Sequence, residues 1–74
     1  MVEFNLNGET YICEEEDSLE KELRKEGLSP NRINESIDLE ITKIVVNGLL
    51  WSVNGYVLGK IFDRVPSLFK KVKK

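Results

Sequence analysis

The sequence has no histidine, no glutamine and no alanine, and its one cysteine is Cys13. Without histidine the chain lacks the commonest general base and the commonest metal ligand. A single cysteine cannot form an internal disulfide, the usual staple of small secreted domains, which points to a reducing compartment. No apolar run approaches the ~20 residues that span a bilayer, and no stretch has the pattern of a signal peptide. These absences predict a cytoplasmic protein without a membrane segment.

The chain is short, and its charges nearly balance. Its 74 residues predict a single domain over residues 1–74, and a domain of this size buries only roughly 60% of the surface that its unfolded chain exposes. Eleven basic and thirteen acidic residues give a net charge of −2, too balanced to indicate nucleic-acid binding from total charge. The distribution is uneven, because residues 14–17 form an acidic run and residues 70–74 read KKVKK.

The first predicted unit is a β-hairpin over residues 2–13. Asn7-Gly8 suits a two-residue type I′ turn, because both residues tolerate a positive φ. That turn fixes the register, with Leu6 opposite Glu9, and opposed residues share a sheet face. Ile12 then lies on the outer face. The apolar inner face is expected to hold Val2, Phe4, Leu6, Tyr11 and Cys13.

A short helix is expected to follow. Asp17 caps its first turn, and Glu20 completes a capping-box arrangement. Few apolar residues lie inside the helix, so only a narrow apolar side of it is expected to pack against the sheet. Gly27 can adopt the left-handed conformation that ends a helix, and Leu28 then packs back on Leu23, as in a Schellman motif.

The middle of the chain allows two interpretations. Residues 28–36 are expected to form a loop or a single helical turn, with Ser29-Pro30 as a cap followed by proline. Residues 33–46 fit both a helical and a strand pattern, but their β-branched side chains favour a strand. If Asn47-Gly48 and Asn54-Gly55 are both hairpin turns, three strands form a meander with Trp51 on the central strand, facing the core. The inner face of the meander would hold Ile44, Val46, Leu49, Trp51, Val53, Tyr56 and Leu58.

A last helix is expected from Asp63 to the C-terminal lysines. Asp63 serves as its cap, and Pro66 falls in the first turn, where a missing N–H does no harm. Apolar residues recur at i, i+3, i+4 and i+7 from Val65, and the lysines complement the negative end of the helix dipole. The element order is therefore ββ-α-βββ-α, a small α+β domain of antiparallel hairpins with both helices on one face.

The stretch VEFNLNGETYICEEEDSLEKELRKEGLS resembles the opening of the β-grasp [2Fe–2S] ferredoxin domains found as small subunits of molybdenum hydroxylases. The shared features are a strand, an Asn-Gly turn, a second strand, an acidic segment before the helix, and a helix with an LRxEGL-like end. Further on, TKIVVNG resembles the CTVLVNG-like strand after their cluster loop, so the resemblance covers residues 2–48. It implies a β-grasp-like scaffold. The cluster needs four cysteines, three of them in that loop; NRINESIDLEIT has none, so no cluster is implied here.

No set of residues predicts catalysis, a cofactor or a metal ion. Cys13 has no histidine to activate it and faces inward, as a small core residue does. The acidic run at residues 14–17 is interpreted as a charged segment that leads into the helix. It is not interpreted as a metal site, since consecutive carboxylates rarely converge on one ion. We therefore expect a non-enzymatic protein without catalytic, cofactor-binding or metal-binding residues.

The expected function is that of a small adaptor or regulatory module that binds another protein or a second copy of itself. In the expected registers four apolar residues fall on the sheet face opposite the core, and exposed apolar patches mark interfaces. A two-fold homodimer that buries these faces is the simplest arrangement. The candidate partner-binding residues are Ile12, Ile41, Val45 and Leu50.

The alternative function is nucleic-acid binding through the last helix. Lysines three residues apart on a helix share a side and would contact phosphates, with an arginine a turn or more away. The acidic run argues against a broad footprint, and no exposed aromatic residue is evident for base stacking. The candidate residues are Arg64, Lys70, Lys71, Lys73 and Lys74.

Overall fold

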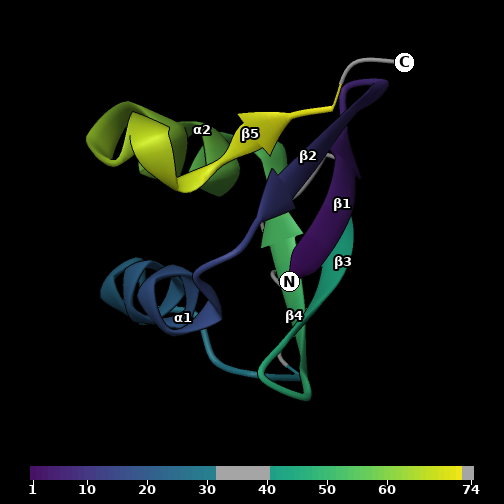
Figure 1. Ribbon diagram of the computed structural model, residues 1–74. Coiled ribbons are helices and arrows are strands. Elements are labelled where there is room, and N and C mark those ends of the chain that lie inside the picture. Colours follow the sequence, from purple (N-terminus) through teal and green to yellow (C-terminus); the bar gives the residue numbers. More distant parts are fainter. Residues whose placement is uncertain (32–40, 73–74) are drawn as a thin grey trace.

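The computed structural model describes residues 1–31 and 41–72. Within them the chain forms two β-hairpins, each followed by an α-helix, and then a short strand (Figure 1). The first half comprises β1 (Val2–Leu6), β2 (Glu9–Cys13) and α1 (Glu16–Lys25). The second half comprises β3 (Ile41–Val46), β4 (Leu49–Asn54), α2 (Gly55–Arg64), the short 3-10 helix η1 (Pro66–Leu68) and β5 (Lys70–Lys71). The predicted α+β class with antiparallel hairpins is confirmed.

The first hairpin has the predicted register. Leu6 lies opposite Glu9, and the pairing continues to the far end of both strands. Asn7 and Gly8 have φ values of 55° and 81°, the positive values that a type I′ turn requires. Side chains of β1 alternate between buried and exposed, so one face of this hairpin contributes to the core and the other faces outward.

Helix α1 starts differently from the prediction and ends as predicted. Its N-cap residue is Glu15, which makes no side-chain capping hydrogen bond, so the prediction that Asp17 caps the helix is wrong. The Asp17 carboxylate instead accepts a hydrogen bond from the side-chain amide of Asn47 at 3.0 Å. At the other end, Gly27 has a φ of 83°, and the N–H of Leu28 donates to the carbonyl of Leu23 at 3.2 Å. These features confirm the Schellman motif.

The second hairpin also turns where the sequence predicted. Ile44 lies opposite Trp51, and Asn47 and Gly48 have φ values of 52° and 78°. Trp51 has no exposed surface, so it belongs to the core. Residues 41–46 form a strand, whereas the rest of the ambiguous segment, residues 33–40, lies outside the described residues. Of the predicted loop at 28–36, only residues 28–31 are described, and they form neither helix nor strand.

The third Asn-Gly pair is not a turn, so the predicted three-stranded meander is wrong. Asn54 ends β4 and caps α2, and its Oδ1 accepts a hydrogen bond from the N–H of Val57 at 2.9 Å. Asparagine is among the best N-cap residues, and the segment that follows has apolar residues at helical spacing. The buried residues of α2 are Val57, Leu58 and Ile61. Tyr56, expected to face the core from a strand, is 62% exposed on this helix.

The predicted helix from Asp63 to the C-terminal lysines is also wrong. Helix α2 ends at Arg64, because Pro66 has no backbone N–H and the residue before a proline avoids the helical conformation. Val65 accordingly has a φ of −135°. After η1, strand β5 (Lys70–Lys71) pairs antiparallel with β2. These lysines therefore lie along a sheet edge, where they cannot complement the dipole of a helix.

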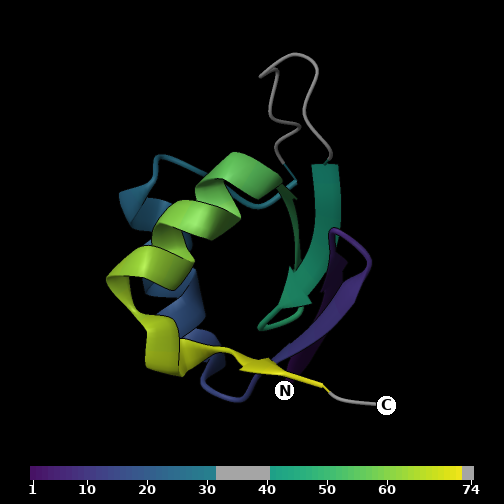
Figure 2. The ribbon, with the colours of Figure 1, turned by 90° about the horizontal axis from the view of Figure 1, so that it is seen from above.

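The strands form one curved layer, and both helices cover its inner side, as predicted (Figure 2). In the described residues, one antiparallel sheet has the order β1-β2-β5 and the other consists of β3 and β4. The two sheets meet where β1 and β3 lie side by side (Figure 1). There the hydroxyl of Thr42 donates to the carbonyl of Asn5 at 3.4 Å.

The core lies between this layer and the two helices. Trp51 and Leu58, from β4 and α2, are among its fully buried side chains. An aromatic cluster fills the side nearest β5, where the rings of Phe62 and Phe69 have centroids 4.3 Å apart. The helices are further joined by Arg64, whose guanidinium lies 2.7 Å from a Glu22 carboxylate oxygen. The core therefore draws on every α-helix and both hairpins in the described part of the chain.

Candidate functional site

Three of the four predicted partner-binding residues lie on the outer side of the β3–β4 hairpin. Val45 and Leu50 are directly opposite each other, and Ile41 points outward from the start of β3. Their exposed fractions are 56%, 41% and 39%. Lys43 occupies the outward position of β3 between Ile41 and Val45, and it is also exposed. We call these four residues the hairpin face.

Ile12, the fourth predicted residue, is placed apart from the hairpin face. It is half-buried on β2, opposite Lys70 of β5. Strand β1 separates β2 from the β3–β4 hairpin. Ile12 lines a small hollow with Ser67 and Leu68 of η1. The hairpin face therefore contains Ile41, Val45 and Leu50 without Ile12.

Two residues of these strands, Leu49 and Glu3, were not predicted as partner-binding residues. Leu49 was expected to face the core opposite Val46; it is 38% exposed, but it lies on the same inner side as Val46 and is not part of the hairpin face. Glu3 points outward from β1, the strand beside β3. The alternation of apolar and charged residues along each strand contains this information. What the sequence could not provide is that β1 lies beside β3, where the two hairpins meet.

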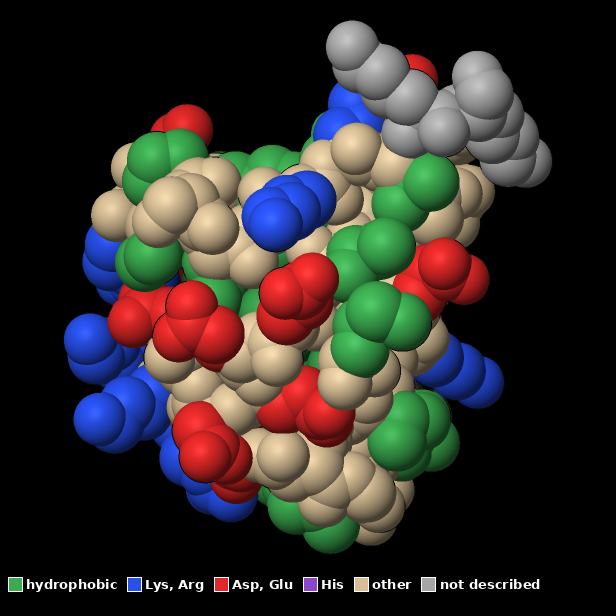
Figure 3. Space-filling view, in the orientation of Figure 1, with side chains coloured by type: hydrophobic (Ala, Val, Ile, Leu, Met, Phe, Trp, Pro, Cys, Tyr) green, Lys and Arg blue, Asp and Glu red, His purple; other side chains and the backbone are tan. Residues whose placement is uncertain are grey.

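Glu3 of β1 and Lys43 of the hairpin face carry opposite charges and have no ion-pair partner in the described part of the chain. Neither Glu3 nor Lys43 forms an ion pair with any residue in 1–31 or 41–72. Both are exposed and point outward from neighbouring strands. In the space-filling view, hydrophobic side chains lie among acidic and basic ones over the strands (Figure 3). As far as the described residues show, this surface thus presents apolar side chains together with a carboxylate and an ammonium group that are free of ion pairs.

The structure does not bring the candidate nucleic-acid residues together on one helix. Arg64 lies at the end of α2, with its guanidinium 2.7 Å from Glu22 and 2.5 Å from Glu26. The hydrogen bond to Glu26 is the main reason why the pKa of Arg64 is raised. Lys71 pairs with the Glu9 carboxylate, while Lys70 is exposed on β5. Lys73 and Lys74 lie outside the described residues.

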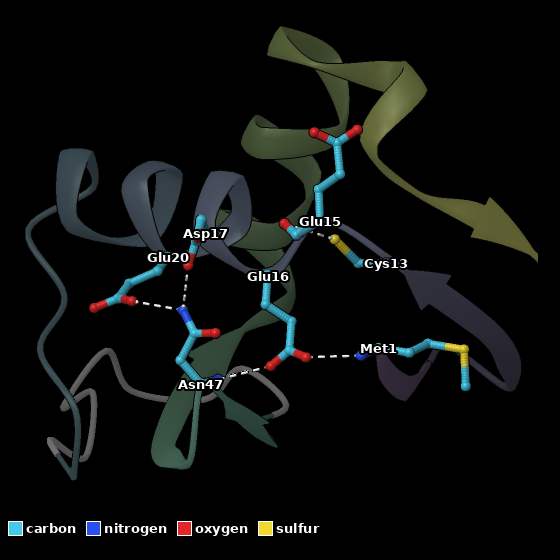
Figure 4. Close-up of polar contacts among 7 residues, drawn as sticks. All are labelled: Met1, Cys13, Glu15, Glu16, Asp17, Glu20 and Asn47. Atoms are coloured by element: carbon cyan, nitrogen blue, oxygen red, sulfur yellow. Dashed lines mark hydrogen bonds and ion pairs between the residues drawn. The ribbon is translucent and has the colours of Figure 1, made fainter.

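The acidic start of α1 holds the β3–β4 turn. Glu16 accepts a hydrogen bond from the backbone N–H of Asn47 at 2.7 Å, and its other oxygen lies 2.7 Å from the amino group of Met1 (Figure 4). The side-chain amide of Asn47 donates to Asp17 at 3.0 Å and to Glu20 at 2.9 Å. We call this set of contacts the junction; its residues are Met1, Glu16, Asp17, Glu20 and Asn47. The junction gives part of the acidic run a structural role.

These contacts lower the pKa values of two carboxylic acids, Glu16 and Glu20. The pKa of Glu16 is lowered, first by the hydrogen bond from the Met1 amino group and then by the N–H of Asn47. The pKa of Glu20 is lowered, first by the amide of Asn47 and then by Arg24. Both groups are therefore more firmly ionised in the folded chain than in the unfolded one.

The described residues show no assembled site for a metal ion, and the thiol is protected. Within 1–31 and 41–72, no group of three histidine, cysteine or acidic side chains is placed to hold a metal. Cys13 is fully buried, and its thiol donates to the carbonyl of Glu15 at 3.5 Å. Burial raises the pKa of this thiol, which keeps it in the less reactive protonated form. Across the same two ranges, no helix is long and apolar enough to cross a membrane.

Comparisons of the chain with protein-family models, curated proteins and solved structures find no match. The resemblance of residues 2–48 to β-grasp ferredoxin domains therefore stays a prediction.

Proposed function

We propose that this protein is a small non-catalytic adaptor or regulatory module that acts by binding protein, and that the hairpin face is its binding surface. The observation that carries the proposal is the outward clustering of Ile41, Val45 and Leu50 on one hairpin. An exposed apolar surface of this kind is typical of an interface when polar residues surround it. The absence of histidine and the protected state of Cys13 support a non-catalytic role. The single cysteine also supports a cytoplasmic setting.

The partner that the charges favour is a second copy of this chain. In a two-fold dimer each surface meets itself, so every contact occurs twice. Lys43 of one copy can then meet Glu3 of the other, and the reverse pair forms at the same time. A surface with an exposed carboxylate and an exposed ammonium group, both without an ion pair in residues 1–31 and 41–72, is complementary to itself in this way.

Sedimentation equilibrium over a concentration series tests the proposed surface. The full chain is expected to form dimers, and Val45→Lys is expected to remain a monomer over the same range, because the substitution places a second ammonium group in the apolar part of the face. Ser67→Lys, which introduces the same ammonium group at an exposed position on η1, is the control and should dimerise normally. A wild-type chain that remains monomeric throughout contradicts self-association.

A photo-crosslinking residue at position 45 then tests protein binding more generally. In cells of the native host, it should capture a defined protein that the same residue at position 67 does not capture. If position 45 yields no specific adduct, either with this chain or with another protein, the proposed function is wrong.

The alternative of nucleic-acid binding gains no support from the described residues. Arg64 and Lys71 are both neutralised by glutamates, and the predicted lysine-bearing helix does not form.

A further inference from the structure

The three Asn-Gly pairs are all chemically susceptible to deamidation of the asparagine, and the fold places them in three environments. When glycine follows asparagine, its backbone nitrogen can attack the asparagine Cγ with little hindrance, because glycine has no side chain. The new N–Cγ bond closes a succinimide ring, the glycine N–H proton is lost, and the side-chain nitrogen leaves as ammonia. Water then opens the ring to aspartate or isoaspartate. The net reaction consumes one water and releases one ammonia.

Asn7 and Asn47 form a closely matched pair. Each is the first residue of a two-residue turn before glycine, with φ values of 55° and 52°, and each is exposed. The Asn7 side chain makes no hydrogen bond within residues 1–31 and 41–72. The Asn47 amide instead donates both of its hydrogens, to Asp17 at 3.0 Å and to Glu20 at 2.9 Å. The two sites therefore differ chiefly in what holds the side chain.

We propose that Asn47-Gly48 is a deamidation site that the fold protects, and that its conversion to aspartate releases the β3–β4 turn from α1. For cyclisation the Asn47 Cγ must turn toward the Gly48 nitrogen. The two carboxylates hold the amide toward α1 (Figure 4), so both hydrogen bonds must break first. Opening of this junction thus precedes the reaction.

The product of deamidation does not fit the junction. Aspartate has no N–H groups to donate, and its carboxylate would face those of Asp17 and Glu20, with Glu16 bound to the backbone N–H of the same residue. Like charges at this spacing repel, and the carboxylates of Asp17 and Glu20 each lose a hydrogen-bond donor. The turn itself is not the obstacle, because Asp-Gly suits a type I′ turn as Asn-Gly does. The reaction therefore replaces attraction with repulsion between the hairpin and α1. This inference is independent of the proposed binding role.

Peptide mapping by mass spectrometry of the folded full chain, incubated at neutral pH, tests the protection. Asn47 is expected to deamidate about tenfold more slowly than Asn7, the factor that two hydrogen bonds of ordinary net strength can supply. In the double variant Asp17→Ala, Glu20→Ala, whose folding is checked by circular dichroism, the rate at Asn47 should approach that at Asn7. Equal rates at the two sites in the wild-type chain would overturn the proposal, as would an unchanged Asn47 rate in the folded double variant.

A second experiment tests whether conversion of Asn47 to aspartate weakens the contact between the β3–β4 turn and α1. Asn47→Asp should lower the thermal unfolding midpoint by about 4 °C or more, whereas the matched control Asn7→Asp should leave it nearly unchanged. Adding Asp17→Asn and Glu20→Gln to Asn47→Asp should restore the midpoint, because amides remove the repulsion and can donate to the new carboxylate. If Asn47→Asp fails to fold, its recovery by those two substitutions supports the proposal. Equal midpoints for the two single variants, or no recovery, would overturn it.

Discussion

The side-chain oxygen of Asn54 accepts a hydrogen bond from the backbone N–H of Val57 at 2.9 Å, at the point where β4 becomes α2. Asn54 is almost fully buried, so no water replaces this bond if the side chain is lost. Asn54→Ala is expected to destabilise the fold by about 1 kcal/mol, and by up to about 2 kcal/mol if the N–H of Val57 remains unpaired. Urea unfolding measures the effect. Asn54→Ser, which keeps an acceptor, should retain most of the stability; equal losses for both variants would contradict a capping role.

Trp51 provides a probe of the core. Its indole is fully buried and its N–H has no hydrogen-bond partner in residues 1–31 and 41–72. Trp51→Phe therefore removes an unpaired polar group together with some volume, and we expect a loss below about 2 kcal/mol. Trp51→Ala leaves a large cavity and should cost about 3–5 kcal/mol. Denaturant unfolding followed by circular dichroism compares the two variants, and a similar loss for both would contradict the described environment.

The junction at Asn47 predicts a sensitivity to acid. The pKa values of Glu16 and Glu20 are lowered in the folded chain, so their contribution to stability is fully present above the ordinary glutamate value, about 4.3. That contribution is lost as the pH falls through the lowered folded-state values. Thermal unfolding from neutral pH into this acid range should show the decline. Glu20→Gln should make the decline shallower, whereas Glu14→Gln, at an exposed position outside the junction, should leave its slope unchanged.

Arg64 is expected to couple the two helices. Its guanidinium contacts Glu22 and Glu26 of the α1 region, and the Glu22 side chain is only 10% exposed. Arg64→Leu should therefore lower the midpoint of urea unfolding. In a double-mutant cycle with Glu22→Leu, the combined loss should be smaller than the sum of the single losses. Additive losses would show that the two residues do not interact.

Local sequence patterns were sufficient to predict both hairpins. Asn7-Gly8 and Asn47-Gly48 each lie between strands whose inward positions are apolar, so the turn and the alternation agree. They were not sufficient at Asn54-Gly55, because the same dipeptide suits a turn and a helix start. The residues that decide are those after it: Val57, Leu58 and Ile61 repeat at helical spacing and are all buried.

Other features of the fold depend on contacts between distant residues. Asp17 has the right type and position for a helix cap, but Asn47, thirty residues away, binds its carboxylate. The C-terminal lysines suggested a helix end, yet Lys70 and Lys71 pair with β2. The outward direction of Val45 and Leu50 followed from the register. The position of the Glu3 strand did not, because no local pattern reports that β1 lies beside β3.

The most direct test of the proposed two-fold interface is a charge exchange between Glu3 and Lys43, measured by sedimentation equilibrium. Glu3→Lys and Lys43→Glu should each raise the dimer dissociation constant by about tenfold, since each removes two ion pairs and introduces repulsion. The double variant should return to near the wild-type value, because the pairs re-form with exchanged charges. Lys21→Glu, on the exposed side of α1, controls for net charge and should have little effect. A wild-type monomer at every concentration, or a double variant no tighter than the single ones, would contradict the account.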